Sequence, residues 1–277
     1  MLFQRLIWAA LASALLVGSV QSGMQQWQAM PIILAAERYE GQKSVSPVAL
    51  EAPAAAVAHG HGDAGAVPQH DHAAASAAWA PANGAERLFW TWVANVIHAL
   101  SMVLLMFAVM GVCVWRGTAL RALPLAFGVA AAGWLSFHFW PSLGLPAEIP
   151  GMDAARLGSR QGWWLLAAGS AALACGALAS LRSPFRWMAA LAWLALPFVV
   201  GAPQIAADPL AGFDPAAQAS LRDLGAQFVW ATTWVSLSFW VSMAVVSGAA
   251  FERWLRPAIQ ALLVRDTAAL PAGKAVT

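Results

Sequence analysis

Four of the six histidines in the sequence form two His-x-His pairs within one stretch that is rich in Ala, Pro and Gly. Neutral imidazole is the commonest protein ligand for transition metals, and carboxylates extend the set. We therefore predict a loose divalent-cation site here, without selectivity among copper, nickel, zinc and cobalt. The alternative interpretation is a solvated low-complexity linker. The residues concerned are His59, His61, Asp63, His70, Asp71 and His72.

His138 lies near the end of a long apolar run, within residues 137–146 (FHFWPSLGLP). Because proline interrupts helical hydrogen bonding, Pro141 and Pro146 are expected to stop or break the helix and to free backbone carbonyls. Broken helices at membrane depth occur where they line a cavity or are buried in protein. His138 is therefore a candidate cation ligand, and the alternative is an interfacial histidine among belt aromatics.

His98 lies in another apolar run and shares one helical stripe with Asn95 and three methionines, at steps of three or four residues. Ionisable groups inside a bilayer are costly and are functional hypotheses by default. The stripe therefore indicates a deeper cation relay. The alternative is packing, since Met fills irregular cores and a neutral His can bond to a neighbouring helix. The methionines are Met102, Met106 and Met110.

Glu37 and Glu40 follow the first apolar run, and their spacing puts them on one face if the segment is helical. Two carboxylates near an outer mouth attract cations. We therefore place both in the candidate metal site with His138, and ordinary interfacial charge is the alternative.

The elements that must position these residues follow from the composition. The chain has 277 residues, of which 60% are hydrophobic and 10% charged, with a mean hydropathy of +0.63. This excludes an ordinary soluble protein, which is about 25% charged, and a disordered one. A net charge of +2 gives no indication of nucleic-acid binding.

Six uncharged gaps in the sequence are longer than the roughly 20 residues of a membrane-spanning helix. They predict an all-α polytopic membrane protein with helices near 6–26, 89–115, 120–140, 162–181, 186–203 and 226–250.

Lys and Arg predict the orientation of this bundle. With the N-terminus inside, the inner segments are short and hold most of the 15 Lys and Arg, whereas the outer loops hold nearly all of the 13 acidic residues. The positive-inside rule therefore favours six spans with both termini cytoplasmic. Alternatively, the first span is a cleaved signal peptide, which leaves five.

Four segments are expected along the chain. They are a first helix with an outer amphipathic segment (1–40), a low-complexity His-rich external loop (41–86), a five-helix membrane bundle (87–256) and a cytoplasmic tail (257–277).

Enzyme motifs are absent from the sequence. Gly273-Lys274 is followed by Ala275, so there is no phosphate-binding G-x-x-x-x-G-K-[ST]. The zinc-protease, serine-hydrolase and haem-attachment motifs are missing too. We therefore expect a non-enzyme without a permanently bound cofactor.

Three blocks of the sequence resemble one family. Residues 31–40 (PIILAAERYE), 137–146 and 200–203 (VGAP) together look like the CbtA family of probable cobalt transporter subunits. The resemblance covers most of the chain and implies a bacterial inner-membrane protein. It implies cobalt uptake for cobalamin synthesis together with a small His-bearing membrane subunit, CbtB. By this resemblance Glu37, Glu40 and His138 match motif positions.

The resulting prediction is a membrane subunit of a divalent-cation uptake system, with cobalt as the transported ion. The alternative is a non-transporting accessory or sensor subunit that binds metal on the outer face.

Overall fold

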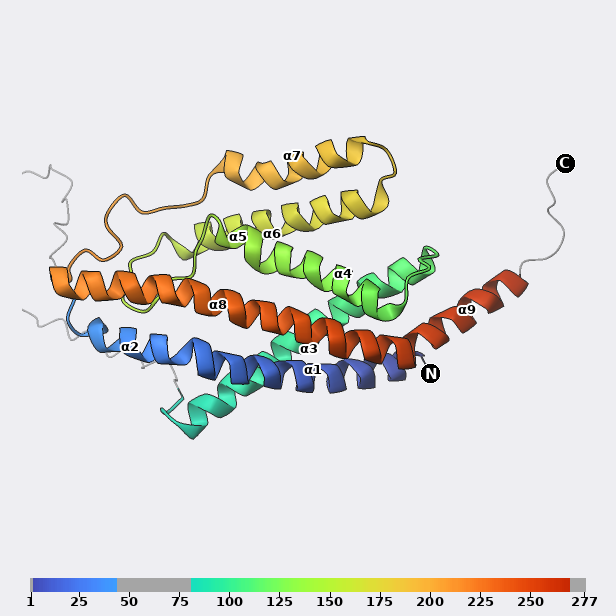
Figure 1. Cartoon of the computed structure of the whole chain (residues 1–277), viewed down its shortest axis with the longest axis horizontal. Coiled ribbons are helices and arrows are strands. Elements are labelled where there is room, and N and C mark those ends of the chain that lie inside the picture. The colour runs from blue at the N-terminus through green and yellow to red at the C-terminus, as the bar shows by residue number, and fades with distance from the viewer. Residues whose placement is uncertain (1, 44–80, 270–277) are drawn as a thin grey trace, which may run out of the picture.

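The computed structural model describes residues 2–43 and 81–269, and nearly all of that part of the chain is helical (Figure 1). No strand occurs within these residues, as the all-α prediction expects. The elements in chain order are α1 (Leu2–Gln28), α2 (Met30–Glu40), α3 (Ala85–Trp115), α4 (Ala122–Trp134), the π-helix η1 (Leu135–Phe139), α5 (Trp140–Ser142), α6 (Leu157–Ser180), α7 (Phe185–Val200), α8 (Pro215–Ala250), the π-helix η2 (Phe251–Leu255) and α9 (Arg256–Ala269).

Five helical stretches of the described chain are long and apolar enough to cross a membrane. The sixth apolar helix, α7, has 16 residues, or about 24 Å at 1.5 Å per residue, which is less than the roughly 30 Å of a hydrocarbon core. The all-α polytopic fold is therefore confirmed, with five candidate membrane-spanning helices and one shorter apolar helix among the described residues. The orientation of the termini stays a prediction. The five are Leu2–Gln28, Ala85–Trp115, Ala122–Ser142, Leu157–Ser180 and Pro215–Arg265.

Several helix ends differ from the sequence-based boundaries, and the start of α8 differs most. α8 begins at Pro215 rather than near 226, because the Asp214 side chain accepts hydrogen bonds from the N–H groups of Ala216 and Ala217 and caps the helix there. Counting apolar residues does not detect this polar extension. α7 ends at Val200, since Gly201 turns to a φ of 86° that few other residues adopt.

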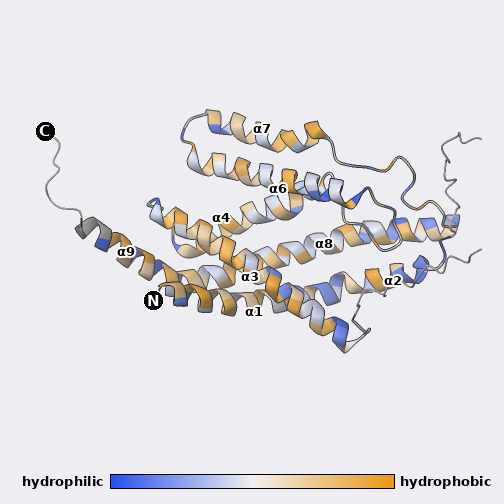
Figure 2. Ribbon diagram, turned by 180° about the vertical axis from the view of Figure 1, so that it is seen from behind, coloured by the Kyte–Doolittle hydropathy of each residue, from blue (hydrophilic) through white to orange (hydrophobic). Residues whose placement is uncertain are grey.

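Small side chains build the interior of the bundle. α1 packs against α3 and α8, and α4 packs against α8, around a core that is rich in alanine. Gly18 shows how closely the helices approach, because a Cβ at this position would lie 2.7 Å from the Cα of Val96. Between helices in lipid, such close packing drives association in place of the hydrophobic effect. Hydrophobic residues occur along these helices over most of their length (Figure 2).

α6 and α7 form a hairpin beside this bundle. Two indole N–H groups hold α7 in place. Trp140 donates to the carbonyl of Leu194 at 3.1 Å, and Trp163 donates to the carbonyl of Pro197 at 2.9 Å. α7 is therefore attached to both α5 and α6.

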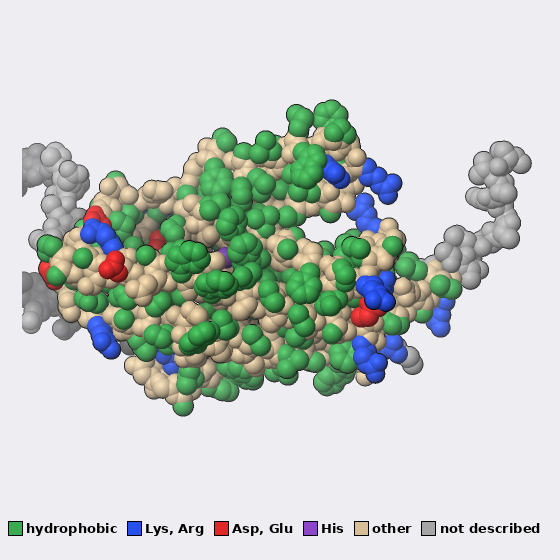
Figure 3. All heavy atoms as spheres, viewed as in Figure 1, with side chains coloured by type: hydrophobic (Ala, Val, Ile, Leu, Met, Phe, Trp, Pro, Cys, Tyr) green, Lys and Arg blue, Asp and Glu red, His purple; other side chains and the backbone are tan. Residues whose placement is uncertain are grey.

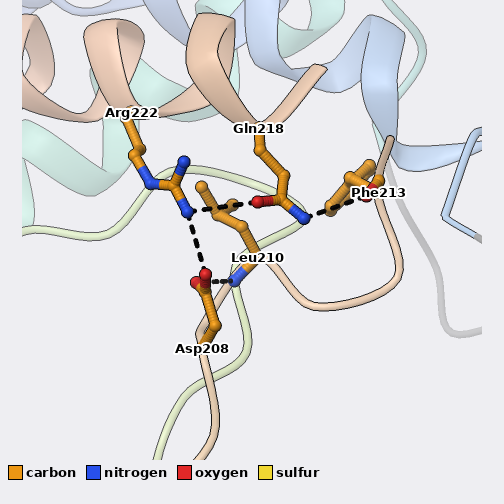
Figure 4. Close-up of polar contacts among 5 residues, drawn as sticks. All are labelled: Asp208, Leu210, Phe213, Gln218 and Arg222. Carbon is orange, nitrogen blue, oxygen red and sulfur yellow. Dashed lines mark hydrogen bonds and ion pairs between the residues drawn. The ribbon is translucent and has the colours of Figure 1, made fainter. Parts of the chain in front are cut away.

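A second, smaller hydrophobic cluster covers one end of the bundle, which we call the cap end. It joins α2, the start of α8 and the segments 143–156 and 201–214. The polar contacts of the last segment are drawn in Figure 4: Asp208 accepts from the N–H of Leu210 at 3.0 Å and from Arg222 at 2.8 Å. The cluster consists of Ala36, Ile149, Leu210, Phe213, Ala217 and Leu221.

The opposite end is rich in Arg, and we call it the arginine end. Arg side chains gather there, whereas acidic side chains are more visible at the cap end (Figure 3). The helix connections at the arginine end contain Arg116, Arg121 and Arg182, and Arg186 lies in the first turn of α7.

Candidate functional site

The turn that carries His138 is a π-helix, and Pro141 explains it. A proline inside a helix has no N–H to donate, and its ring crowds the carbonyl four residues earlier. The wider turn η1 ends two residues before Pro141, and the helix then continues to Ser142. The break expected at Pro141 is therefore a wide turn, and the chain leaves the helix before Pro146. Single π-turns of this kind are frequent at functional sites.

His138 points toward α8. Its Nε2 lies 3.4 Å from the hydroxyl oxygen of Thr233. Thr233 donates its only hydroxyl proton to the carbonyl of Val229 at 2.8 Å, so its oxygen can only accept from the histidine. We therefore assign the ring proton to Nε2. The Nδ1 atom then keeps the lone pair with which neutral imidazole binds a metal.

A pocket of about 170 Å³ lies beside the His138 ring. At about 30 Å³ per water molecule, this volume corresponds to roughly six waters. The hydroxyls of Ser142 and Thr232 donate to the backbone carbonyls of Phe139 and Val229, so their oxygens can still accept or coordinate. The lining residues are Phe137, His138, Pro141, Ser142, Leu145, Ala147, Trp164, Val229, Thr232 and Thr233.

This arrangement suits a partly hydrated divalent cation. Imidazole nitrogen is a ligand for the later transition metals, and hydroxyl oxygens and waters complete a coordination sphere. The Trp134 ring lies 6.0 Å from the His138 ring between centroids, and Phe137, which lines the same pocket, stacks on Trp240. The site offers few ligands, and few ligands favour the release of a bound ion over its tight retention.

Glu37 and Glu40 do not lie in this pocket. Glu37 forms an ion pair with Arg87 at 2.8 Å, which joins α2 to the start of α3. Glu40 is exposed at the end of α2. Within residues 2–43 and 81–269, no group of three or more His, Cys, Asp or Glu side chains could hold a metal ion together. The structure thus does not bring the two carboxylates to His138.

His98 is also separate from the pocket. It lies on an exposed side of α3, where its ring packs on Phe239 at 5.2 Å between centroids. The stripe in which it was predicted divides between core and surface: Met106 and Met110 are buried in the bundle core and Met102 is partly buried. The methionines therefore pack the core. The other four predicted ligands, His59, His61, His70 and His72, lie outside the described residues.

Two charged residues near the pocket were missed by the sequence reasoning. Arg160 and Glu148 form an ion pair at 2.5 Å in a second, larger pocket of about 570 Å³. The available signal was the proximity of Glu148 to the Pro141–Pro146 interruption. Thr233 was missed because its partner is 95 residues away in the sequence. The larger pocket is lined by Leu145, Pro146, Ala147, Glu148, Leu157, Arg160, Gln161, Trp164 and Leu165.

Comparison with known proteins gives one match. A family model described as "Probable cobalt transporter subunit (CbtA)" matches residues 3–252, which is most of the chain. No curated protein matches the chain, and no solved structure does.

Proposed function

Because the chain belongs to the CbtA family of probable cobalt transporter subunits, we propose that it is the membrane subunit through which a bacterium takes up cobalt for cobalamin synthesis. The observation that carries this proposal is the His138 pocket. It combines a free imidazole nitrogen with hydroxyl oxygens inside a helical bundle of membrane-spanning length. We propose that it handles the ion as cargo and performs no catalysis.

The direction of transport follows in this proposal from the charges of the two ends. We place the arginine end in the cytoplasm, by the positive-inside rule, and the cap end outside the inner membrane. A membrane potential of 100 mV favours inward movement by about 2.3 kcal/mol per charge, or about 4.6 kcal/mol for a divalent cation. The potential can therefore drive uptake without a nucleotide-binding site in this chain.

The His-rich segment and the partner extend the proposal. We propose that His59, His61, His70 and His72 raise the cation concentration near the cap end, and that the transported ion then reaches His138. The family description as a subunit implies a partner. We propose a small His-bearing membrane protein of the CbtB type.

The second candidate function is a non-transporting accessory or sensor subunit. What favours it is the absence, among the described residues, of a cluster of three or more strong metal ligands in the membrane. In that case the His-rich segment would be the main metal site and the His138 pocket would be a packing defect.

Uptake of radiolabelled cobalt separates the two candidates. Cells that lack other cobalt importers would express the chain with its partner, with nickel and zinc as competitors. His138→Ala is expected to reduce uptake to background, whereas deletion of residues 55–75 is expected to weaken it mainly at low cobalt concentration. His98→Ala is the matched control, because it removes an imidazole from a membrane helix outside the pocket.

Each outcome decides between the candidates. Uptake that depends on His138 but not on His98 supports the transport function. No uptake by the wild type with its partner, together with cobalt binding that is lost on deletion of residues 55–75, supports the accessory function.

A further inference from the structure

The Arg160–Glu148 ion pair lies at a position from which it can control access to His138. The larger pocket, which contains the pair, and the His138 pocket share three lining residues: Leu145, Ala147 and Trp164. The two cavities therefore adjoin. Among the described residues, Glu148 and Arg160 are the only Asp, Glu, Lys or Arg residues that line either of them.

The guanidinium of Arg160 is incompletely hydrogen-bonded in its ion pair with Glu148. Its side chain is 27% exposed and that of Glu148 is 29% exposed, so water screens the pair only partly. Within the described part of the chain, the buried Nε of Arg160 has no hydrogen-bond partner. A guanidinium with an unsatisfied buried N–H gains less from its position than a fully bonded one. Arg160 is therefore poised to leave when Glu148 engages another cation.

We propose, resting on the proposed function, that Glu148 is the first binding site of the incoming divalent cation and that Arg160 is its competitor. A carboxylate is a ligand for divalent cations, and Arg160 occupies it when no ion is present. The approaching ion displaces the guanidinium from Glu148, and the neighbouring pocket then offers it His138. One carboxylate and water bind the ion weakly enough for it to move on.

A purely structural ion pair makes a different prediction. If the pair only ties the segment 143–156 to α6, then removing either partner damages the same contact and both substitutions act in one direction. If Arg160 competes with the ion, the two substitutions act in opposite directions. Loss of Arg160 frees the carboxylate and removes a repelling charge, whereas loss of Glu148 removes the ligand.

The test is the concentration dependence of radiolabelled cobalt uptake in wild type, Arg160→Gln and Glu148→Gln. We expect Arg160→Gln to lower the KM about two- to fivefold, as for a partly exposed ion pair worth up to about 1 kcal/mol. Glu148→Gln is expected to raise the KM by a similar factor. Arg222→Gln is the matched control, because Arg222 also pairs with a carboxylate at the cap end, Asp208 at 2.8 Å, but lines neither pocket.

The possible results are distinguishable. KM shifts in opposite directions support the proposal, while shifts in the same direction, or none, overturn it and leave the transport function standing. Immunoblotting of membranes verifies that each variant is inserted, and Arg160→Lys, which keeps the charge, is expected to restore the wild-type KM. If the wild type itself takes up no cobalt, the transport function fails. Cobalt titration of the purified proteins then tests the ion pair alone. The Kd for cobalt is expected to be lower than that of the wild type in Arg160→Gln and higher in Glu148→Gln.

Discussion

The chain contains two π-turns that arise in the same way and have different surroundings. η1 ends at Phe139, two residues before Pro141, and η2 ends at Leu255, two residues before Pro257. In both, a wide turn accommodates the proline without ending the helix. The backbone feature alone therefore identifies no function.

The side chains around the two turns differ. At η2, Phe251 and Leu255 are buried, and Glu252 accepts hydrogen bonds from the N–H of Ala122 and from Arg256, both at 2.9 Å. At η1, the turn lines a pocket and its histidine keeps a free ring nitrogen. The comparison indicates that η2 only connects α8 to α9, whereas η1 connects α4 to α5 and also borders a pocket with room for an ion.

Removing the two prolines tests this contrast most strongly. With Pro141→Ala the turn can relax to a regular α-helix, which rotates His138 by about 100° relative to its surroundings and away from Thr233. We expect cobalt uptake to fall at least about tenfold, equivalent to 1.4 kcal/mol. Pro257→Ala removes the corresponding constraint at η2 and is expected to leave the initial uptake rate unchanged. Equal losses in both variants would show that the two turns do not differ in function.

Two glycines near these turns provide the next test. A Cβ at Gly133 would lie 2.3 Å from the Trp240 ring, and a Cβ at Gly248 would lie 2.9 Å from the Cβ of Ala126. Overpacking costs about 1–3 kcal/mol, partly offset by the roughly 1 kcal/mol helix preference of Ala over Gly. Gly133→Ala and Gly248→Ala should therefore both lower the melting temperature in detergent, whereas Gly128→Ala, with no neighbour within 4 Å, should not.

The same glycine variants also separate the two turns by activity. Trp240 stacks on Phe137, which lines the His138 pocket. Gly133→Ala is therefore expected to reduce cobalt uptake per folded molecule, while Gly248→Ala is not. A reduction confined to Gly248→Ala would contradict the assignment of the pocket to η1.

A smaller effect is expected from the hydrogen bond that orients His138. Thr233→Val removes the acceptor at 3.4 Å, and a hydrogen bond of about 1 kcal/mol corresponds to a roughly fivefold lower uptake rate. Thr233→Ser keeps the hydroxyl and should restore the rate. If Val and Ser behave alike, Thr233 acts only through its shape.

The sequence predicted the helices better than the site. The uncharged gaps placed every apolar helix of the described chain, because lipid requires long apolar segments whose backbone groups are bonded internally. Residue spacing contains no information on tertiary partners. Glu37 was grouped with His138, but it pairs with Arg87, 50 residues later. The distortion of the helix at His138 could be predicted because Pro141 is only three residues away in the sequence. The role of His138 as a metal ligand stays a prediction.

The smallest expected effect concerns Glu252, the polar residue of η2. Its carboxylate bonds the first N–H of α4 and pairs with Arg256, so it opposes the partial positive charge of a helix N-terminus. Glu252→Gln keeps an acceptor but loses the charge, which should cost about 0.3–1 kcal/mol of stability. We expect a slightly lower melting temperature and unchanged cobalt uptake. A fall in uptake at unchanged stability would mean that the ion also depends on η2. The path would then extend from His138 to the arginine end through both π-turns.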